Sequence, residues 1–204
     1  IDRYGKTPLP PYIRRNDAAP GSDRERYQTV YAKYRGSIAA PTAGLHFTPE
    51  ILQAVRSRGA QIAEITLHVG YGTFQPVRAE ELSDHRVLPE RYEIDAVTAE
   101  MLQNAKSRGQ RIVAVGTTTT RALESNFAAN GRFEAVRTEA DLTITPGYEF
   151  RAVDALLTNF HLPQSSLLIL TSTFGGHKLI MDAYRHAVDA GYRFYSYGDC
   201  MFIR

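Results

Sequence analysis

Stretches that favour helices and stretches that favour strands alternate along this 204-residue chain. One helix–turn–strand unit is well marked: Thr48 is a natural N-cap, Pro49 takes the first helical position, and Gly59 follows the last turn. Residues 60–69 then alternate apolar and polar side chains, which predicts a strand. A similar unit follows over residues 101–115, an echo that chance explains as well as duplication does. The alternation predicts an α/β fold with a mixed or parallel sheet covered by helices.

The rest of the chain predicts a lead-in, an irregular segment and further elements. Prolines keep residues 1–21 extended, and residues 129–151 lack a clear period, so we expect an exposed excursion there. The other expected elements are, in chain order, a helix over 22–34, a strand over 153–158, helices over 165–173 and 177–190, and strands over 192–196 and 199–203.

Composition excludes several classes of protein. A hydrophobic fraction of 43% with a net charge of +2 excludes a disordered chain. No apolar run approaches the roughly 20 residues that span a bilayer. The single cysteine, Cys200, excludes an internal disulfide and fits a reducing cytosol. The 6 histidines form no His-x-x-x-His pair, so a metal site has little local support.

Small polar clusters lie just after predicted strands or beside glycine-rich turns. They cover residues 44–47, 68–73, 116–121, 158–161 and 197–199. Ligands bind at the carboxyl ends of strands in α/β sheets, so these clusters predict a polar cleft. His46, His68 and His161 each follow an apolar stretch, and a neutral imidazole there can act as a general base. A core-edge histidine bonded to backbone is an equal alternative for each.

Two further features have a functional and a structural interpretation. The run Thr117–Thr120 with Arg121 lies between a strand and a helix, where it can bind a phosphate or carboxylate or simply cap the helix. Asp199, in an otherwise apolar strand, is either paired structurally or functional. The residues by themselves therefore predict a soluble α/β domain with a polar cleft, and they name no reaction.

Read together, seven segments resemble one family almost from end to end. They are residues 5–13, 25–32, 39–48, 67–74, 115–124, 158–163 and 192–199. In this order they are similar to the S-adenosylmethionine:tRNA ribosyltransferase-isomerases of queuosine biosynthesis. The chain departs from that family's pattern in two places. Leu88 stands where the family usually has a second histidine, three residues after the one matching His85, and residues 172–176 also differ.

The resemblance implies an architecture. Residues 1–204 correspond to the carboxyl-terminal portion of the main α/β domain, with a mixed, barrel-like sheet covered by helices. We expect the family's amino-terminal segment and its small inserted β-barrel domain to be absent from this chain. We also expect a cytoplasmic monomer with no membrane segment.

The resemblance also implies a reaction. Such an enzyme moves the ribosyl group of S-adenosylmethionine onto 7-aminomethyl-7-deazaguanine in tRNA, giving epoxyqueuosine and releasing adenine and methionine. S-adenosylmethionine is a co-substrate, tRNA is the partner, and no true cofactor or metal is implied. Three alternatives remain open: a tRNA-binding remnant without catalysis, a paralogue that uses S-adenosylmethionine on a small-molecule acceptor, and a fragment that folds but has no activity of its own.

The implied site residues follow from the matched segments. His46, His68 or His161 is the expected base that removes a proton beside the sulfonium, at the ribose 5′ carbon. Asp199 or Glu90 supplies or orients the proton that adenine needs to leave. The expected substrate-binding residues are Arg26, Tyr27, Thr42, Gly70, Gly72, Thr73, Thr117, Thr118, Arg121, Asn159 and Tyr197.

Overall fold

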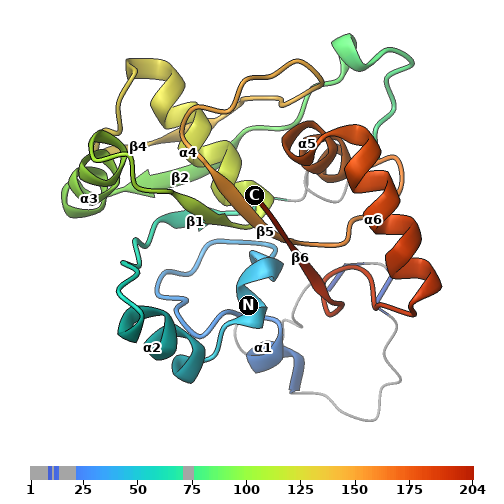
Figure 1. The fold of residues 1–204 in the computed structure, drawn as a ribbon, viewed down its shortest axis with the longest axis horizontal. Helices are drawn as coiled ribbons and strands as arrows, with labels where there is room; N and C mark the ends of the chain where they lie inside the picture. Colours follow the sequence, from blue (N-terminus) through green and yellow to red (C-terminus); the bar gives the residue numbers. More distant parts are fainter. Residues whose placement is uncertain (1–8, 11, 14–21, 71–75) are drawn as a thin grey trace.

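The strands of this computed structural model form two three-stranded sheets (Figure 1). The structure describes residues 9–10, 12–13, 22–70 and 76–204. The first sheet is antiparallel, in the order β1-β2-β4, with β1 at Thr66–His68, β2 at Glu90–Ile94 and β4 at Val136–Ala140. The second has the order β3-β5-β6, with β3 at Val113–Val115, β5 at Ala155–Asn159 and β6 at Cys200–Ile203.

The second sheet is mixed, because β3 runs parallel to β5 while β6 runs antiparallel to it. The mixed α/β class is therefore confirmed. The strands of the described residues are divided between two small sheets, and they do not close into a barrel.

Helices flank both sheets. Their bounds are α1 Ser22–Arg26, α2 Pro49–Ser57, α3 Ala96–Ser107, α4 Thr117–Asn130, α5 Ser166–Gly175 and α6 His177–Asp189, with short 3-10 turns η1 Thr42–His46 and η3 Leu82–Asp84. The predicted start of α2 is confirmed, because the Ile51 amide donates to the Thr48 hydroxyl over 3.3 Å. None of the helices of the described residues is long and apolar enough to cross a membrane.

The two similar helix–turn–strand units have different structural roles. Helix α2 has no buried residue, whereas α3 buries Thr98, Ala99 and Leu102. Strands β1 and β3, which follow these helices, belong to different sheets. The sequence echo therefore does not correspond to a structural repeat.

Three expectations from the sequence were wrong. The helix expected over 22–34 ends at Arg26. Residues 192–196 form a loop instead of a strand, because the Asp199 carboxylate accepts the Arg193 amide over 2.8 Å and satisfies the backbone locally. Residues 129–151 are not an exposed excursion, since they contain β4, which pairs with β2. The three central residues of β4, Arg137, Thr138 and Glu139, are all polar, so the strand shows no clear apolar period.

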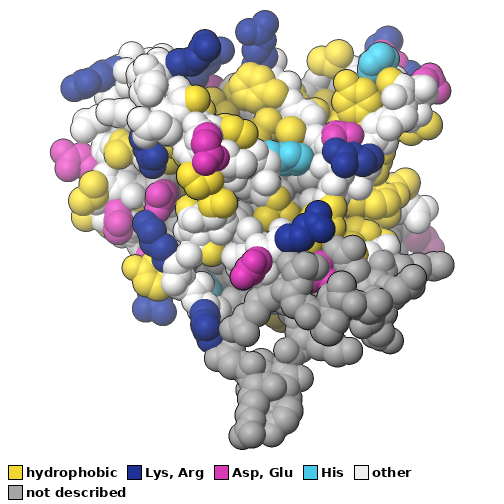
Figure 2. Space-filling view, turned by 90° about the horizontal axis from the view of Figure 1, so that it is seen from below, with side chains coloured by type: hydrophobic (Ala, Val, Ile, Leu, Met, Phe, Trp, Pro, Cys, Tyr) yellow, Lys and Arg dark blue, Asp and Glu magenta, His cyan; other side chains and the backbone are white. Residues whose placement is uncertain are grey.

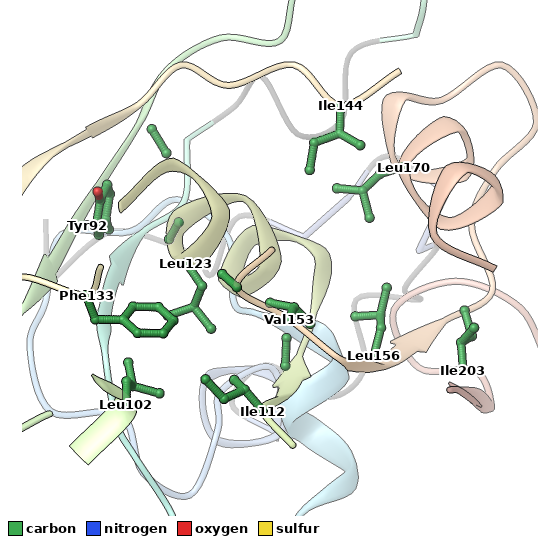
Figure 3. Close-up of a cluster of buried hydrophobic side chains, with 14 of the residues drawn as sticks. Tyr92, Leu102, Ile112, Leu123, Phe133, Ile144, Val153, Leu156, Leu170 and Ile203 are labelled. Atoms are coloured by element: carbon green, nitrogen blue, oxygen red, sulfur yellow. The ribbon is translucent and has the colours of Figure 1, made fainter. Parts of the chain in front are cut away.

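The core surrounds α4 and β5. Figure 3 shows Leu123 of α4 near Phe133 and Val153, with Leu156 of β5 in the same group. Leu123 and Leu156 are almost fully buried. This packing fixes where α4 begins and where β5 ends, and both points contribute to the site described next.

The surface carries mixed charge. In Figure 2, Lys and Arg side chains are spread over the visible face among acidic and apolar ones. This distribution agrees with the small net charge of +2.

Candidate functional site

A pocket forms where segments far apart in the sequence meet. Its wall comes mainly from residues 39–43, 116–118, 158–165 and 195–196. These segments contain the start of η1, the first turn of α4, the end of β5 with the loop after it, and the loop before β6. Each of the five polar clusters singled out in the sequence therefore has a described residue in this wall or next to it.

The first turn of α4 faces the pocket with its polar groups open. Gly116 is the N-cap, with a φ of 95° that favours glycine, and no side chain caps the helix. The hydroxyls of Thr119 and Thr120 bond back to the carbonyls of Val115 and Gly116, at 2.8 and 3.1 Å. Thr117 and Thr118 line the pocket, and their hydroxyls have no hydrogen-bond partner among the described residues. The positive end of the α4 dipole therefore points at a ligand-sized space.

Arg121 and Glu90 lie outside this pocket, which corrects the roles expected for them. Their side chains are only 4% and 6% exposed, and Arg121 Nη1 donates to Glu90 Oε2 over 2.8 Å. The other guanidinium nitrogens donate to the carbonyls of Leu88, Ala140 and Leu142. All three guanidinium nitrogens therefore donate to partners in the core, and the group does not face the pocket. The expected proton source Glu90 is held by the same ion pair.

The three candidate histidines do not share one wall. His161 lines the pocket, and its Nε2 lies 2.8 Å from the Thr158 hydroxyl. His46 lies one residue behind the wall, bonded to Asn159. His68, at the end of β1, lies against Gly36, where an added Cβ would be 2.8 Å from its Nδ1. Of the three, only His161 is part of the wall, while His46 adjoins it through Asn159 and His68 is the neighbour of Val69, which lines it.

Burial keeps these imidazoles neutral. It lowers the pKa of His161 to about 4. Burial also lowers the pKa of His46, with the Asp199 carboxylate opposing that shift and Arg193 adding to it. Both rings are therefore uncharged at neutral pH, each with one unprotonated nitrogen.

Asn159 connects His46 to the pocket wall. Its Nδ2 donates to His46 Nε2 and to the Tyr195 carbonyl, both over 3.1 Å, while its Oδ1 accepts from the Thr42 hydroxyl over 3.5 Å. Asn159 and Thr42 both line the pocket. The amide itself is already committed to protein partners.

The loop before β6 is held by Asp199. Its carboxylate accepts the Arg193 guanidinium over 2.9 Å, and this contact together with the Arg193 amide lowers the pKa of Asp199. Gly198 is required there, because a Cβ would lie 2.4 Å from the Arg193 carbonyl oxygen. Asp199 is therefore an ionised structural anchor that also acts electrostatically on His46.

Three expected substrate-binding residues form a separate aromatic group. The Arg26 guanidinium lies 5.9 Å from the centre of the Tyr197 ring, and the Tyr27 ring meets Tyr197 edge-on at 5.7 Å. Tyr27 is buried, and burial raises its pKa to about 12. None of the three is part of the pocket wall.

The loop after β1 is only partly described. Gly70 is half-buried and is not part of the pocket wall. Gly72 and Thr73, together with Tyr71, lie outside the described residues.

Three polar residues of the wall were not among the expected site residues. Tyr12, Tyr195 and Ser196 line the pocket, and the Tyr12 and Ser196 hydroxyls are hydrogen-bonded to each other. Tyr195 has a φ of 71°, which is unusual for a residue with a side chain and accompanies many functional sites. Ser196 and Tyr195 belong to the segment 192–199 that carried the resemblance, which was the available signal.

The model of a family described as "Queuosine biosynthesis protein" matches residues 1–203 of this chain. The chain belongs to this family. Two curated relatives, both named S-adenosylmethionine:tRNA ribosyltransferase-isomerase, come from Geotalea uraniireducens and Natranaerobius thermophilus. The first is 55% identical over 203 residues, with 100% of this chain and 59% of the relative covered. The second is 51% identical over 204 residues, with 100% and 58% covered.

A solved structure is also similar to this chain. It is an S-adenosylmethionine tRNA ribosyltransferase from Thermotoga maritima, with 44% identity and a TM-score of 0.64 over 79% of this chain and 51% of that one. The chain thus spans about three fifths of the length of the curated relatives it matches.

Proposed function

We propose that the protein to which this chain belongs transfers the ribosyl group of S-adenosylmethionine to 7-aminomethyl-7-deazaguanine in tRNA, and that this chain supplies the S-adenosylmethionine pocket. One observation carries the proposal: a single pocket gathers the open first turn of α4, the His161 ring and the Thr42–Asn159 amide contact from distant segments. The names of the relatives support the choice of reaction.

The first turn of α4 suits the methionine carboxylate of S-adenosylmethionine. Unbonded amides and a positive dipole end attract an anion there. The free hydroxyls of Thr117 and Thr118 add donors at the same wall. This assignment keeps the expected role of the threonine run and removes Arg121 from it.

His161 is the residue that we assign as the base. It is the candidate whose ring belongs to the pocket wall, and its lowered pKa keeps it neutral. The sulfonium of S-adenosylmethionine acidifies the neighbouring ribose 5′ carbon. A neutral imidazole beside that carbon removes its proton, and the carbon then carries the electron pair stabilised by sulfur.

Asp199 takes an orienting role and is not the acid for adenine. Arg193 holds the pKa of Asp199 below its ordinary value, so the carboxylate has no proton to give at neutral pH. Glu90 is likewise removed from the list of acids by its bond to Arg121.

The decisive measurement is free adenine after incubation with S-adenosylmethionine and precursor tRNA. The chain is tested alone and as a chimera that supplies the remaining portion of the Geotalea relative. In the active form, His161→Ala should abolish adenine release. The matched control is His186→Ala, at an exposed position on α6, and should leave the release unchanged.

Other outcomes separate the alternatives. Salt-dependent tRNA binding without adenine release would favour a non-catalytic tRNA-binding protein. Binding of S-adenosylmethionine that is indifferent to tRNA would favour a paralogue with a small acceptor. Adenine release that survives His161→Ala would reject the base assignment.

A further inference from the structure

The orientation of the Asn159 amide is fixed by a backbone carbonyl. The Tyr195 oxygen can only accept a hydrogen bond, so the Asn159 atom 3.1 Å away from it must be the nitrogen. The Thr42 hydroxyl on the other side then donates to the amide oxygen. This assignment does not depend on any histidine.

The tautomer of His46 follows from that orientation. The same Asn159 nitrogen lies 3.1 Å from His46 Nε2 and directs its second N–H at it. Two donors cannot face each other, so Nε2 must present its electron pair, and the single ring proton of the neutral imidazole is on Nδ1. The nitrogen of His46 that faces the pocket side is therefore already occupied as an acceptor.

The Asn159 contact also supports a strained part of the pocket wall. Tyr195, with its φ of 71°, is held by its amide donating to the Phe160 carbonyl over 2.9 Å. Its own carbonyl accepts from Gly198 over 3.0 Å and from Asn159 over 3.1 Å. A conformation that is rare for a tyrosine persists only when several such contacts define it.

We propose that His46 is a positioning residue: through Asn159 it holds the Tyr195–Ser196 wall of the pocket, and it does not itself remove a proton from the substrate. The part of this inference that concerns catalysis rests on the proposed function. The tautomer of His46 and its contact with Asn159 do not depend on it. The charged groups that act on the ring are Asp199, which favours protonation, and Arg193, which opposes it. Because these two charges shift the pKa of His46 in opposite directions, we infer that the Asn159 contact determines which ring nitrogen carries the proton.

The first experiment needs no activity. Nitrogen NMR of the histidine rings in the labelled chain reports the tautomer of His46, assigned by its loss in His46→Gln. We expect the Nδ1–H form, and a ring that stays neutral to lower pH than an ordinary histidine. An Nε2–H tautomer in the neutral ring overturns the proposal.

The variant Asn159→Asp reverses the polarity of the contact. A carboxylate cannot donate to Nε2, so His46 should switch to the Nε2–H form and titrate at higher pH than in the parent chain. If the Asn159→Asp chain folds and the tautomer of His46 is unchanged, the proposed contact between Asn159 and His46 is wrong. If that variant does not fold, the tautomer of the parent chain decides alone.

The second experiment separates positioning from chemistry in the adenine assay. The amide oxygen of His46→Gln can accept from Asn159 but cannot titrate, whereas His46→Ala removes the acceptor. We expect the glutamine variant to keep adenine release within about 10-fold of the parent and the alanine variant to lose about 100-fold, the scale of a roughly 1 Å misplacement. Equal, large losses in both variants overturn the proposal. If no form of the protein releases adenine, the proposed function fails, and the NMR result still decides the role of His46.

Discussion

Helix α4 carries two polar regions that differ in how their side chains are used. In its first turn, the hydroxyls of Thr117 and Thr118 face the pocket without a partner among the described residues. Further along the same helix, the Glu124 carboxylate is 1% exposed and accepts four hydrogen bonds. These come from the Tyr148 hydroxyl and from the amides of residues 151–153. The Arg121 side chain is buried in the same way, with its hydrogen bonds made to protein groups.

The difference teaches how to distinguish a structural polar group from a ligand-binding one. A buried polar side chain whose hydrogen bonds are all made to protein stabilises the fold, and losing it is costly. A polar side chain at a pocket wall with open donors stabilises the fold little and remains available to a ligand. The sequence segment 115–124 contains both kinds, so its resemblance to one family does not tell them apart.

The largest effect should come from Glu124→Ala. It leaves the Tyr148 hydroxyl and three backbone amides, two of them buried, without their acceptor, each at a cost of about 1–3 kcal/mol. We expect urea unfolding to show a loss on the order of 5 kcal/mol. The control Glu149→Ala, whose side chain is 83% exposed, should change stability by no more than about 0.5 kcal/mol. Similar losses of unfolding free energy in the two variants would contradict the distinction between buried, fully bonded polar groups and exposed ones.

Arg121→Met should follow closely. It leaves the Glu90 carboxylate buried and without its 2.8 Å partner, which costs about 3–5 kcal/mol in other proteins. The double variant with Glu90→Leu should lose less than Arg121→Met alone, because no charge remains in the core. Lys178→Met, which breaks an exposed pair with Asp182, should cost at most about 0.5 kcal/mol. Urea unfolding of the four chains measures all three differences.

The pocket side should respond to pH. Burial lowers the pKa of His161 to about 4, below its ordinary value of 6.5, so the folded chain binds fewer protons than the unfolded chain between these values. Stability contributed by the neutral ring is therefore full above pH 6.5 and is lost as pH falls toward 4. At about 1.4 kcal/mol per unit, the parent chain should lose about 2–3 kcal/mol more than His161→Asn between pH 7 and pH 4.5. An identical pH dependence of unfolding in the two chains contradicts this assignment.

The smallest change in stability should come from Thr118→Val. Its hydroxyl has no hydrogen-bond partner to lose in the described part of the chain, so unfolding should change by less than about 1 kcal/mol. Calorimetry should nevertheless show S-adenosylmethionine binding weakened by roughly 3- to 10-fold, the worth of one hydrogen bond. Thr120→Val is the matched control, because the buried Thr120 hydroxyl bonds to the Gly116 carbonyl and lies away from the pocket. This variant should lose stability and keep its affinity for S-adenosylmethionine. Unchanged affinity in Thr118→Val would separate the first turn of α4 from the ligand.

Local signals in the sequence predicted a good part of this fold. Thr48, Pro49 and Gly59 predicted α2, because capping and φ preferences act within a few residues. The helices α5 and α6 also lie close to their predicted ranges. Strands β2 and β4 were not predicted, since polar Glu90 of β2 and Thr138 of β4 lie on the face that carries Tyr92 and Ile94 and interrupt its apolar pattern.

The sequence by itself determined the α/β class, the family and the segments from which a site is built, because periodicity, caps and motif order are properties of neighbouring residues. Only the tertiary structure decided what each polar residue in those segments does. Arg121 donates hydrogen bonds to Glu90 and to backbone carbonyls of the core. His161 lines the pocket, whereas His46 lies behind the wall and contacts the wall residue Asn159. The physical reason is that a hydrogen-bond partner is chosen by distance in space, and these partners lie up to 113 residues apart along the chain.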